Sequence, residues 1–538
     1  MAGSSIFGVR NKAIYPLILG FLIFLFAAAD VGMARSKNIK SYLEQASVGN
    51  TILNIFYKER NFTPLWTGRG DRKRRNALIA TLENAPTHGL PASRYRPDEL
   101  MARLKAARSG ADQAQIEVAL SEVFLRYATD VNSGFLRPAD IDGDIKRRGP
   151  FIDQRLFLKQ IVDSDPVSAM AALAPEIPQY TALMKEKLEL EKVIFAGGWG
   201  PQVPSSRLDS GSSGPLVVIL RDRLIKRGYL KRMSGKHYDG AIEFAVRAFQ
   251  NDHGLTPDGI AASVTLSEVN ISAKIRLRAV LVALERLRWM NYNLGARHIW
   301  VNLPDFTAQV IDNGKLTFET RAVIGANVDG QRSPEFSENM RYLAVNPSWN
   351  VPSSITALEY FPQLQQNSDA FNFFELVSAD GEVVSRDQVD FLTYTPETFP
   401  FRLRQPPSDD NALGRVKFMF PNINNIYMHD TPQKSLFSKE IRAFSHGCIR
   451  LAQPLEFAHV LLARQSDNPY ALFKKALSQA PNEYIISLAN EVPVHLVYFT
   501  AFPNSEGKIQ YRSDVYGRDP IFLDALRKKG LKVIGLDG

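Results

Sequence analysis

The segment Ser445-His446-Gly447-Cys448-Ile449-Arg450 contains Cys448, the only cysteine in a chain of 538 residues. Sixteen residues before Ser445 lies His429, within the stretch IYMHDTP at 426–432. A thiol reacts as the thiolate, and a histidine can act as its base because the imidazole titrates near neutral pH. Gly447 permits a turn that a β-carbon would hinder, and exposed backbone N–H groups there can hold a developing oxyanion. This pattern predicts a cysteine nucleophile activated by a histidine.

The pair of motifs resembles the signature of the L,D-transpeptidase catalytic domain of the YkuD type, a histidine followed after about fifteen residues by Ser-His-Gly-Cys. Here the spacer runs from Asp430 to Phe444. The flanking stretches NALGRVKF (411–418) and RAF (442–444) are similar to the large periplasmic branch of that family. The resemblance covers most of the chain, from about residue 55 to about residue 519. It implies a multidomain α+β protein with a helical scaffold domain, a three-helix peptidoglycan-binding-like domain and a β-rich catalytic domain.

The same resemblance assigns the catalytic roles. Cys448 is the nucleophile and His429 the general base, while His446 and Gly447 shape the loop that carries the thiol. Asp430 stands where the family often uses a backbone carbonyl to orient the histidine, so a role for its side chain stays open.

Four further residues are candidates for substrate binding. Arg450 suits bidentate binding of a stem-peptide carboxylate, although a structural salt bridge is the alternative. Tyr427 and Trp349 are candidate walls of the groove, although aromatic residues are as often part of a core. Ser445 belongs to the same loop as the thiol.

A metal centre is the competing interpretation of these residues. His429, His446 and Cys448 could supply the three protein ligands of a catalytic zinc. Two of them lie only two residues apart, and no general-base glutamate motif accompanies them. The sequence therefore predicts no metal site and no cofactor.

Composition limits the class of protein. At this length we expect two to four domains, and 45% apolar with 22% charged residues is ordinary for a globular protein. The formal charge of +9 and a pI of about 9.3 favour anionic surroundings such as cell-wall polymer or lipid headgroups. No nucleic-acid signature accompanies the charge, so no nucleic-acid partner is predicted. A single cysteine excludes an intrachain disulfide.

The N-terminal segment predicts export. Arg10 and Lys12 precede an apolar run at 13–29, and the small residues at 32–34 form a possible cleavage site. A run of 17 residues also reaches the lower limit for a membrane span. Residues 1–34 are therefore a signal peptide or an inner-membrane anchor, and the rest is expected in the periplasm, touching the membrane only through this segment.

Hydrophobic periodicity and turn residues divide the remaining chain. The helical scaffold is predicted at 35–205, the peptidoglycan-binding-like domain at 206–270, a linking helix at 271–295, the catalytic domain at 296–505, and a tail at 506–538. An insertion interrupts the β pattern of the catalytic domain at 353–405. The resemblance implies that this insertion is a capping lid, and a surface insertion without a role at the site is the alternative. Within 206–270, the motif FQ…HGL…DG at 249–259 resembles the family, but Ala261-Ala262 replaces its usual glycine. Glycan binding and a purely structural spacer are both open for this domain.

By resemblance, the expected activity is peptidoglycan cross-linking. Cys448 attacks the L-centre carbonyl of diaminopimelate in a tetrapeptide stem and expels D-alanine, and the side-chain amine of a second stem then resolves the thioester into a 3→3 cross-link. Lipoprotein attachment or hydrolysis would use the same thioester, so the motif leaves the acceptor open. A non-catalytic wall-binding scaffold is the alternative from another class. Carbapenems are expected to acylate the thiol.

Overall fold

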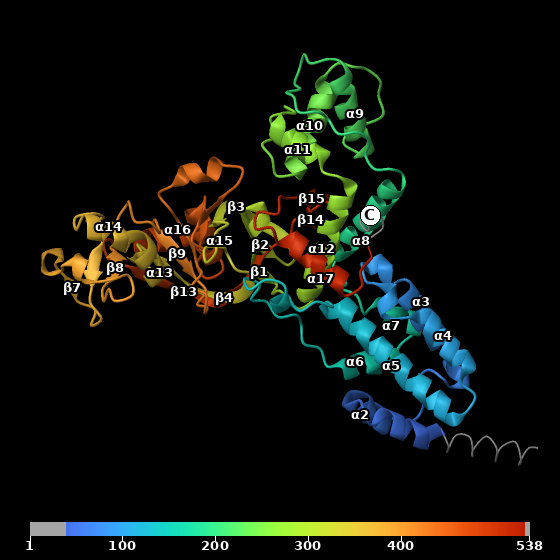
Figure 1. Cartoon of the computed structure of the whole chain (residues 1–538). Coiled ribbons are helices and arrows are strands. Elements are labelled where there is room, and N and C mark those ends of the chain that lie inside the picture. Colours follow the sequence, from blue (N-terminus) through green and yellow to red (C-terminus); the bar gives the residue numbers. More distant parts are fainter. Residues whose placement is uncertain (1–38, 533–538) are drawn as a thin grey trace, which may run out of the picture. The chain divides into compact units, whose positions relative to one another are not determined.

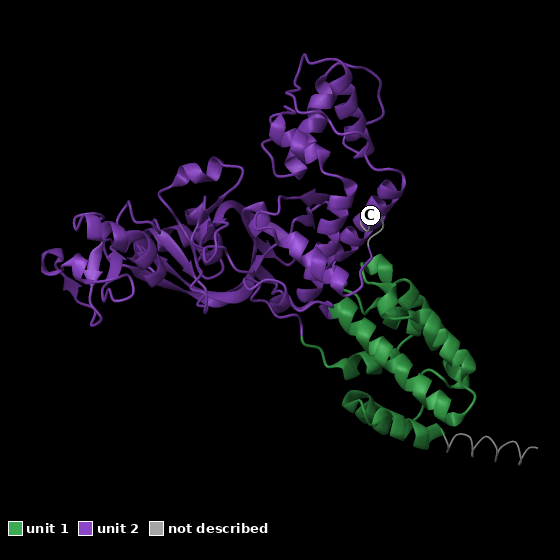
Figure 2. Ribbon diagram, in the orientation of Figure 1, with its two compact units in different colours: residues 1–132, 151–175 green, residues 133–150, 176–538 purple. Residues whose placement is uncertain are grey.

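The computed structural model describes residues 39–532. The apolar run at 13–29 and the last six residues of the predicted tail lie outside the described residues. The chain forms two compact units, residues 1–132 with 151–175 and residues 133–150 with 176–538 (Figure 2). No helix within 39–532 is both long and apolar enough to cross a membrane.

The first unit is built from helices. They are α2 (Thr51–Glu59), α3 (Arg72–Glu83), α4 (Pro97–Ala106), α5 (Gly110–Ser133), α6 (Gln154–Asp163) and α7 (Pro166–Ala171). The apolar residues at 111–128 recur with helical spacing and predict a helix there, and the long α5 contains this stretch and buries most of its length. Its Glu117 carboxylate accepts hydrogen bonds from the Tyr57 hydroxyl (2.8 Å) and from the backbone N–H groups of Trp66 (3.0 Å) and Thr67 (2.8 Å). A buried carboxylate needs such partners, and these hold the loop after α2 against α5.

The second unit begins with residues 133–150, whose side chains bind to buried groups of that unit. Arg518, which is fully buried in α17 (Arg518–Lys528), binds Asp142 (3.1 Å) and Glu335 (2.9 Å). Arg147 donates to the carbonyl of Leu496 at 2.9 Å. These contacts explain why residues 133–150 belong to this unit rather than to the helices on either side of them in the sequence.

Three helices follow, and they match the predicted small domain. α9 (Pro215–Lys226), α10 (Gly240–Asp252) and α11 (Ser263–Asn270) enclose their own core. Asp239 caps α10 by accepting from the N–H groups of Ala241 and Ile242, as the sequence predicts. α12 (Ala273–Trp289) is the predicted linking helix, and it packs on α8 (Pro178–Phe195) (Figure 1).

A mixed sheet carries the predicted catalytic residues. Its strands are β1 (Arg297–Asn302), β2 (Thr307–Asp312), β3 (Lys315–Gly325), β4 (Phe336–Val345), β9 (Val416–Met419), β10 (Met428–His429), β11 (Ala443–Ser445), β12 (Ile449–Leu451) and β13 (Tyr484–Val497). Within the described residues the order is β11-β3-β12-β10-β9-β4-β13-β1-β2, and β2 also pairs with β3, so the sheet closes on itself. Its interior is the main hydrophobic core, to which α15 (Pro454–Leu462) and α16 (Pro469–Leu477) add Phe457 and Phe473. The mixed α+β class predicted from the sequence is confirmed.

The insertion predicted at 353–405 forms, together with the preceding strand β5, a small domain of its own, called the lid below. It contains β5 (Trp349–Asn350), β6 (Glu375–Val377), β7 (Val383–Val384) and β8 (Arg402–Gln405) in the order β5-β8-β6-β7, with α13 (Ser353–Ile355), the π-helical turn η6 (Thr356–Tyr360) and α14 (Phe361–Gln366). Its core is separate and rich in phenylalanine. The lid thus folds around its own apolar side chains and projects two segments, β5 and η6, toward the nucleophile loop.

Candidate active site

Two short parallel strands bring the halves of the motif together. In β10 and β12, Met428 lies opposite Ile449 and His429 lies opposite Arg450. Met428 and Ile449 are fully buried in the core. Because side chains alternate along a strand, His429 and Arg450 point to the other face. Cys448 directly precedes β12 and packs partly against the core. The pairing of β10 with β12 thus brings His429 beside the strand that follows Cys448, although the two residues are nineteen positions apart in the sequence.

His429 is held as a neutral base. Its Nδ1–H donates to the carbonyl oxygen of Asp430 at 2.5 Å, which leaves Nε2 free to accept a proton. Burial lowers the pKa of His429 to about 3, and the neighbouring positive charges of Arg450 and Lys434 lower it as well. The imidazole is therefore uncharged at neutral pH, the form in which it can act as a base.

The side chain of Asp430 has other partners. Its carboxylate accepts from the N–H groups of Arg415 (2.9 Å) and Thr431 (2.7 Å) and pairs with Lys434 (2.5 Å). Only its backbone carbonyl contacts His429. The geometry therefore gives the orienting role to the carbonyl, and the carboxylate holds the start of β9 and the turn after β10.

Cys448 is half-buried in an environment that opposes ionisation. Burial raises the pKa of its thiol to about 11, while hydrogen bonding from Tyr427 and the charge of Arg450 act in the opposite direction. Sγ lies 3.8 Å from the carbonyl oxygen of Asn425. The rings of Tyr427 and His429 meet edge to face with centroids 5.6 Å apart. Tyr427 therefore contacts both members of the pair, whereas no direct hydrogen bond joins them in the part of the chain that the structure describes.

The hydroxyl of Ser445 closes the loop that precedes Cys448. Ser445 Oγ donates to the carbonyl of Cys448 (2.6 Å) and accepts from the N–H of Gly447 (3.1 Å), and the residue is 2% exposed. Gly447 has φ +107°, and a β-carbon there would lie 3.0 Å from Cδ1 of Ile426. Glycine is needed at this position, and Ser445 lies inside the loop rather than on its open side.

Two lid residues contact the candidate site, one at His446 and one at Tyr427. His446 Nε2 contacts Oε1 of Glu359 in η6. Trp349 in β5 hydrogen-bonds the Tyr427 side chain, whose pKa is raised by burial and by the nearby thiol. Arg450 donates to Oε1 of Gln433 at 2.7 Å. Glu359 carries no signal in the sequence, because 87 residues separate it from His446.

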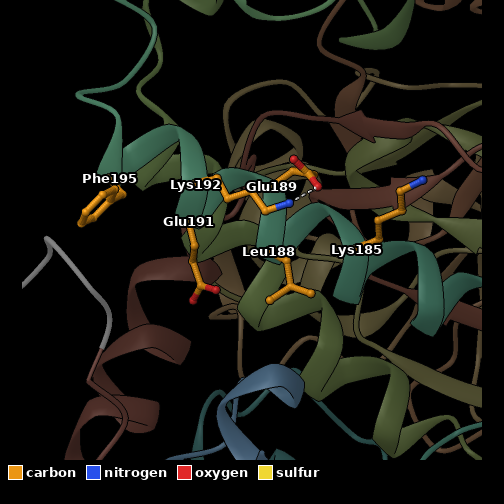
Figure 3. A pocket seen from close by; sticks show the side chains of 6 residues that line it. All are labelled: Lys185, Leu188, Glu189, Glu191, Lys192 and Phe195. Carbon is orange, nitrogen blue, oxygen red and sulfur yellow. Dashed lines mark hydrogen bonds and ion pairs between the residues drawn. The ribbon is translucent and has the colours of Figure 1, made fainter.

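A hollow away from this site lies along one face of α8. It holds about 450 Å³ and is lined by Lys185, Leu188, Glu189, Glu191, Lys192 and Phe195 (Figure 3). None of the predicted site residues lines it. Lys192 pairs with Glu189, one helical turn away, at 2.8 Å, so the charges of these two residues are satisfied locally.

A metal site finds no support in the geometry. Within residues 39–532, no group of three or more histidine, cysteine, aspartate or glutamate side chains is arranged to hold an ion. His446 faces Glu359, and His429 donates to a carbonyl.

Comparison with known proteins agrees with this arrangement. Residues 296–469 match the family described as "L,D-transpeptidase catalytic domain" (YkuD), residues 51–186 match "Scaffold domain", and residues 213–268 match "Putative peptidoglycan binding domain". A curated protein of Haemophilus influenzae, described as "Putative L,D-transpeptidase", is 30% identical over 262 residues, which are 47% of this chain and 50% of that protein. The chain thus spans about half the length of the curated relative that it matches.

Solved structures with the same description are more distant. An L,D-transpeptidase fragment from Xylanimonas cellulosilytica is 16% identical over 55% of this chain and 98% of its own, with a TM-score of 0.16. An L,D-transpeptidase from Stackebrandtia nassauensis is 14% identical over 57% of this chain and all of its own, with a TM-score of 0.21. At these scores neither bears on the fold.

Proposed function

Because the chain carries an L,D-transpeptidase catalytic domain of the YkuD family together with a scaffold domain and a peptidoglycan-binding domain, we propose that it is an exported enzyme that forms 3→3 cross-links in peptidoglycan. The observation that carries the proposal is that His429, whose Nδ1 is bound to a backbone carbonyl, and Cys448 both contact the side chain of Tyr427. The described relative supports the reaction class. The basic charge of the chain suits an anionic wall polymer in the periplasm.

The chemistry starts from two neutral groups. The pKa values of about 3 for His429 and about 11 for Cys448 favour a resting thiol over a preformed ion pair. As sulfur attacks the carbonyl carbon at the L-centre of diaminopimelate, Nε2 takes the thiol proton, and the carbonyl π pair moves onto oxygen. When the tetrahedral intermediate collapses, the C–N bond breaks and the proton passes to the leaving D-alanine amine.

The second half of the reaction reverses these transfers. The side-chain amine of a second stem attacks the thioester, His429 accepts its proton, and the C–S bond breaks to regenerate the thiol. Arg450, which has one guanidinium edge bound to Gln433, is positioned to stabilise negative charge near the thiol. The positive charge of Arg450 also lowers the pKa of His429, so the imidazole is neutral before the reaction and can accept a proton.

Intact-protein mass spectrometry tests the proposal. The purified full chain is incubated with a disaccharide tetrapeptide, beside Cys448→Ala. The expected result is a covalent adduct that has lost D-alanine, present in the wild type and absent from the variant. No adduct with the tetrapeptide and none with a carbapenem would overturn the enzyme and favour a wall-binding scaffold.

The products in the same tube identify the acceptor. A cross-linked dimer supports the 3→3 reaction, and a tripeptide without a dimer indicates hydrolysis. A lipoprotein with an exposed lysine, added in a parallel reaction, becomes joined to the stem if a protein is the true acceptor. Either of the last two results would replace cross-linking as the activity while leaving the thioester step intact.

A further inference from the structure

The backbone amides of the nucleophile loop differ in what they bind. The N–H of Gly447 is already used, since it donates to Ser445 Oγ at 3.1 Å. The N–H of Cys448 has no hydrogen-bond acceptor among residues 39–532. An oxyanion that forms on attack by Sγ needs a donor that is free and already oriented. Of these two amides, only that of Cys448 meets the first condition.

The orientation of that amide is fixed from the opposite end of its peptide group. The carbonyl oxygen of Gly447 accepts a hydrogen bond from Ser333 Oγ at 2.7 Å. The Gly447–Cys448 peptide is trans, so its C=O and N–H point in opposite directions. A carbonyl turned inward to Ser333 therefore turns the Cys448 N–H outward, away from the core.

The direction of the Ser333 hydrogen bond is also determined. Ser333 Oγ accepts from the N–H of Gly325 at 2.9 Å, so its single proton is left for Gly447. Ser333 is fully buried, and a β-carbon on Gly325 would come within 2.6 Å of its nitrogen. The end of β3 and the loop that follows it thus hold this hydroxyl in one position.

A second hydroxyl supports the first. Tyr516 Oη accepts from the N–H of Ser333 (3.1 Å) and donates to the carbonyl of Gly325 (2.7 Å). Its ring stacks on Tyr498 with centroids 5.6 Å apart, and the residue is buried. Ser333 and Tyr516 lie 114 and 69 positions from Gly447 in the sequence, so this support exists only in the folded chain.

We propose that Ser333 is a positioning residue for acyl transfer, which fixes the Gly447–Cys448 peptide so that the N–H of Cys448 stabilises the oxyanion. This inference deepens the proposed function, because it requires that Cys448 be acylated. Ser333 contacts neither substrate nor thiol, and Tyr516 acts one step further away by holding Ser333.

Two small probes separate this role from a general structural one. With p-nitrophenyl acetate, the thiolate attacks the carbonyl carbon, the π pair moves onto oxygen, and collapse releases p-nitrophenolate. With iodoacetamide, the thiolate displaces iodide at a saturated carbon, and no oxyanion forms. Damage to the thiol or to its base slows both reactions, whereas loss of the oxyanion donor slows only the first.

The experiment compares the full chain with Ser333→Ala, Ser333→Thr and Ser438→Ala. Ser438 is an exposed serine that donates to a local carbonyl and serves as the matched control. We expect Ser333→Ala to slow acylation about tenfold and to change alkylation by less than about twofold, as removal of a whole oxyanion donor costs about 100-fold or more. Ser333→Thr, which keeps the hydroxyl, should recover most of the rate, and Ser438→Ala should match the wild type.

A fall in both rates by the same factor would overturn the inference, as would no change in either rate. If Ser333→Ala does not fold, Tyr516→Phe provides the reading: a drop of about threefold in acylation alone supports the inference, and an unchanged ratio overturns it. The ester contains no stem peptide. A wild type that reacts with the ester but forms no adduct with the tetrapeptide would therefore overturn the proposed function and leave this result standing.

Discussion

The candidate active site and the motif at 249–259 of the three-helix domain (the motif loop) each contain a buried histidine, in opposite situations. In the first, His429 keeps Nε2 free and the thiol is half-buried. In the second, His253 is buried between Phe249, at a centroid distance of 3.9 Å, and Tyr511, at 5.8 Å. Tyr511 belongs to the hairpin β14 (Ala501–Pro503) and β15 (Ile509–Tyr511), which follows the catalytic sheet in the chain.

Further contacts close the motif loop of the small domain. Arg512 donates to the carbonyl of Asp252 at 2.9 Å, and Lys508 pairs with the carboxylate of the same residue. Asp252 and His253 are thus already bound to the hairpin and the residue that follows it. The comparison teaches that a family motif specifies a local fold, and that the packing around it decides whether the motif meets a ligand. Any glycan bound by this domain would contact its other surfaces, where Phe244 is 74% exposed.

The largest expected effect contrasts the two buried histidines. His429→Gln removes the proton acceptor and should slow acylation by about 10³-fold, within the usual range for a general base. His253→Gln should leave acylation unchanged and lower the free energy of unfolding by roughly 1–3 kcal/mol, because a stacked and buried ring is lost. Stopped-flow kinetics measure the acylation rate, and thermal unfolding measures the change in stability. Equal losses of acylation in both variants would remove the distinction between the loops.

The next effect contrasts two glycines with positive φ. Gly447→Ala forces a strained loop against Ile426 and should slow acylation about 100-fold, as misplacing a reacting group by about 1 Å does. Gly254→Ala, at φ +68°, places a β-carbon 2.7 Å from Nε of Arg512. It should loosen the small domain from the hairpin without slowing acylation. Faster proteolysis within residues 201–214, which precede α9, would report the loosening, and unchanged proteolysis would mean that Arg512 moves aside at little cost.

The parts predicted well from the sequence are those that local pattern determines. Alternation and turn residues locate β1, β2 and β3 to within a few residues, and the apolar stripes and the Asp239 cap locate the three small helices. The spacing from His429 to Cys448 matches two strand ends that pair in parallel, so the motif and the sheet agree. The family comparisons confirm the predicted domain types.

The remainder depends on contacts between distant segments. No pattern in the sequence around Ser333 predicts its role, because its partner Gly447 lies 114 residues away and contacts it only in the folded chain. Glu359 meets His446 for the same reason. The buried state of His253 depends on a hairpin that begins 248 residues later. The side chain of Asp430 suggests a catalytic triad by its position alone, and only its contacts with Arg415 and Lys434 assign it elsewhere.

The pH dependence of alkylation at Cys448 shows how far the surroundings of the thiol oppose its ionisation. With the pKa of Cys448 at about 11, the thiolate fraction grows tenfold per pH unit below that value. Alkylation by iodoacetamide should therefore rise about tenfold per unit from pH 7 to 10, without the plateau near pH 9 that an ordinary thiol shows. Arg450→Gln removes a cation that favours the thiolate, so its rate at pH 8 should fall roughly 3-fold to 10-fold. Arg464→Gln, an exposed arginine paired with Asp312, is the control. A plateau below pH 8 would show a preformed thiolate and contradict the resting state proposed here.

The smallest effect concerns the contact between the lid and the nucleophile loop. The side chains of His446 and Glu359 are 34% and 39% exposed, and pairs of this kind contribute at most about 1 kcal/mol and are screened by salt. Glu359→Gln should therefore raise the KM for the tetrapeptide donor about twofold to threefold at low salt and leave kcat unchanged. His446→Gln should reproduce the Glu359→Gln result if the histidine only joins the loop to the lid. A kcat that falls more than about tenfold in His446→Gln alone would instead place its ring in the chemistry, because removing its lid partner cannot produce that loss.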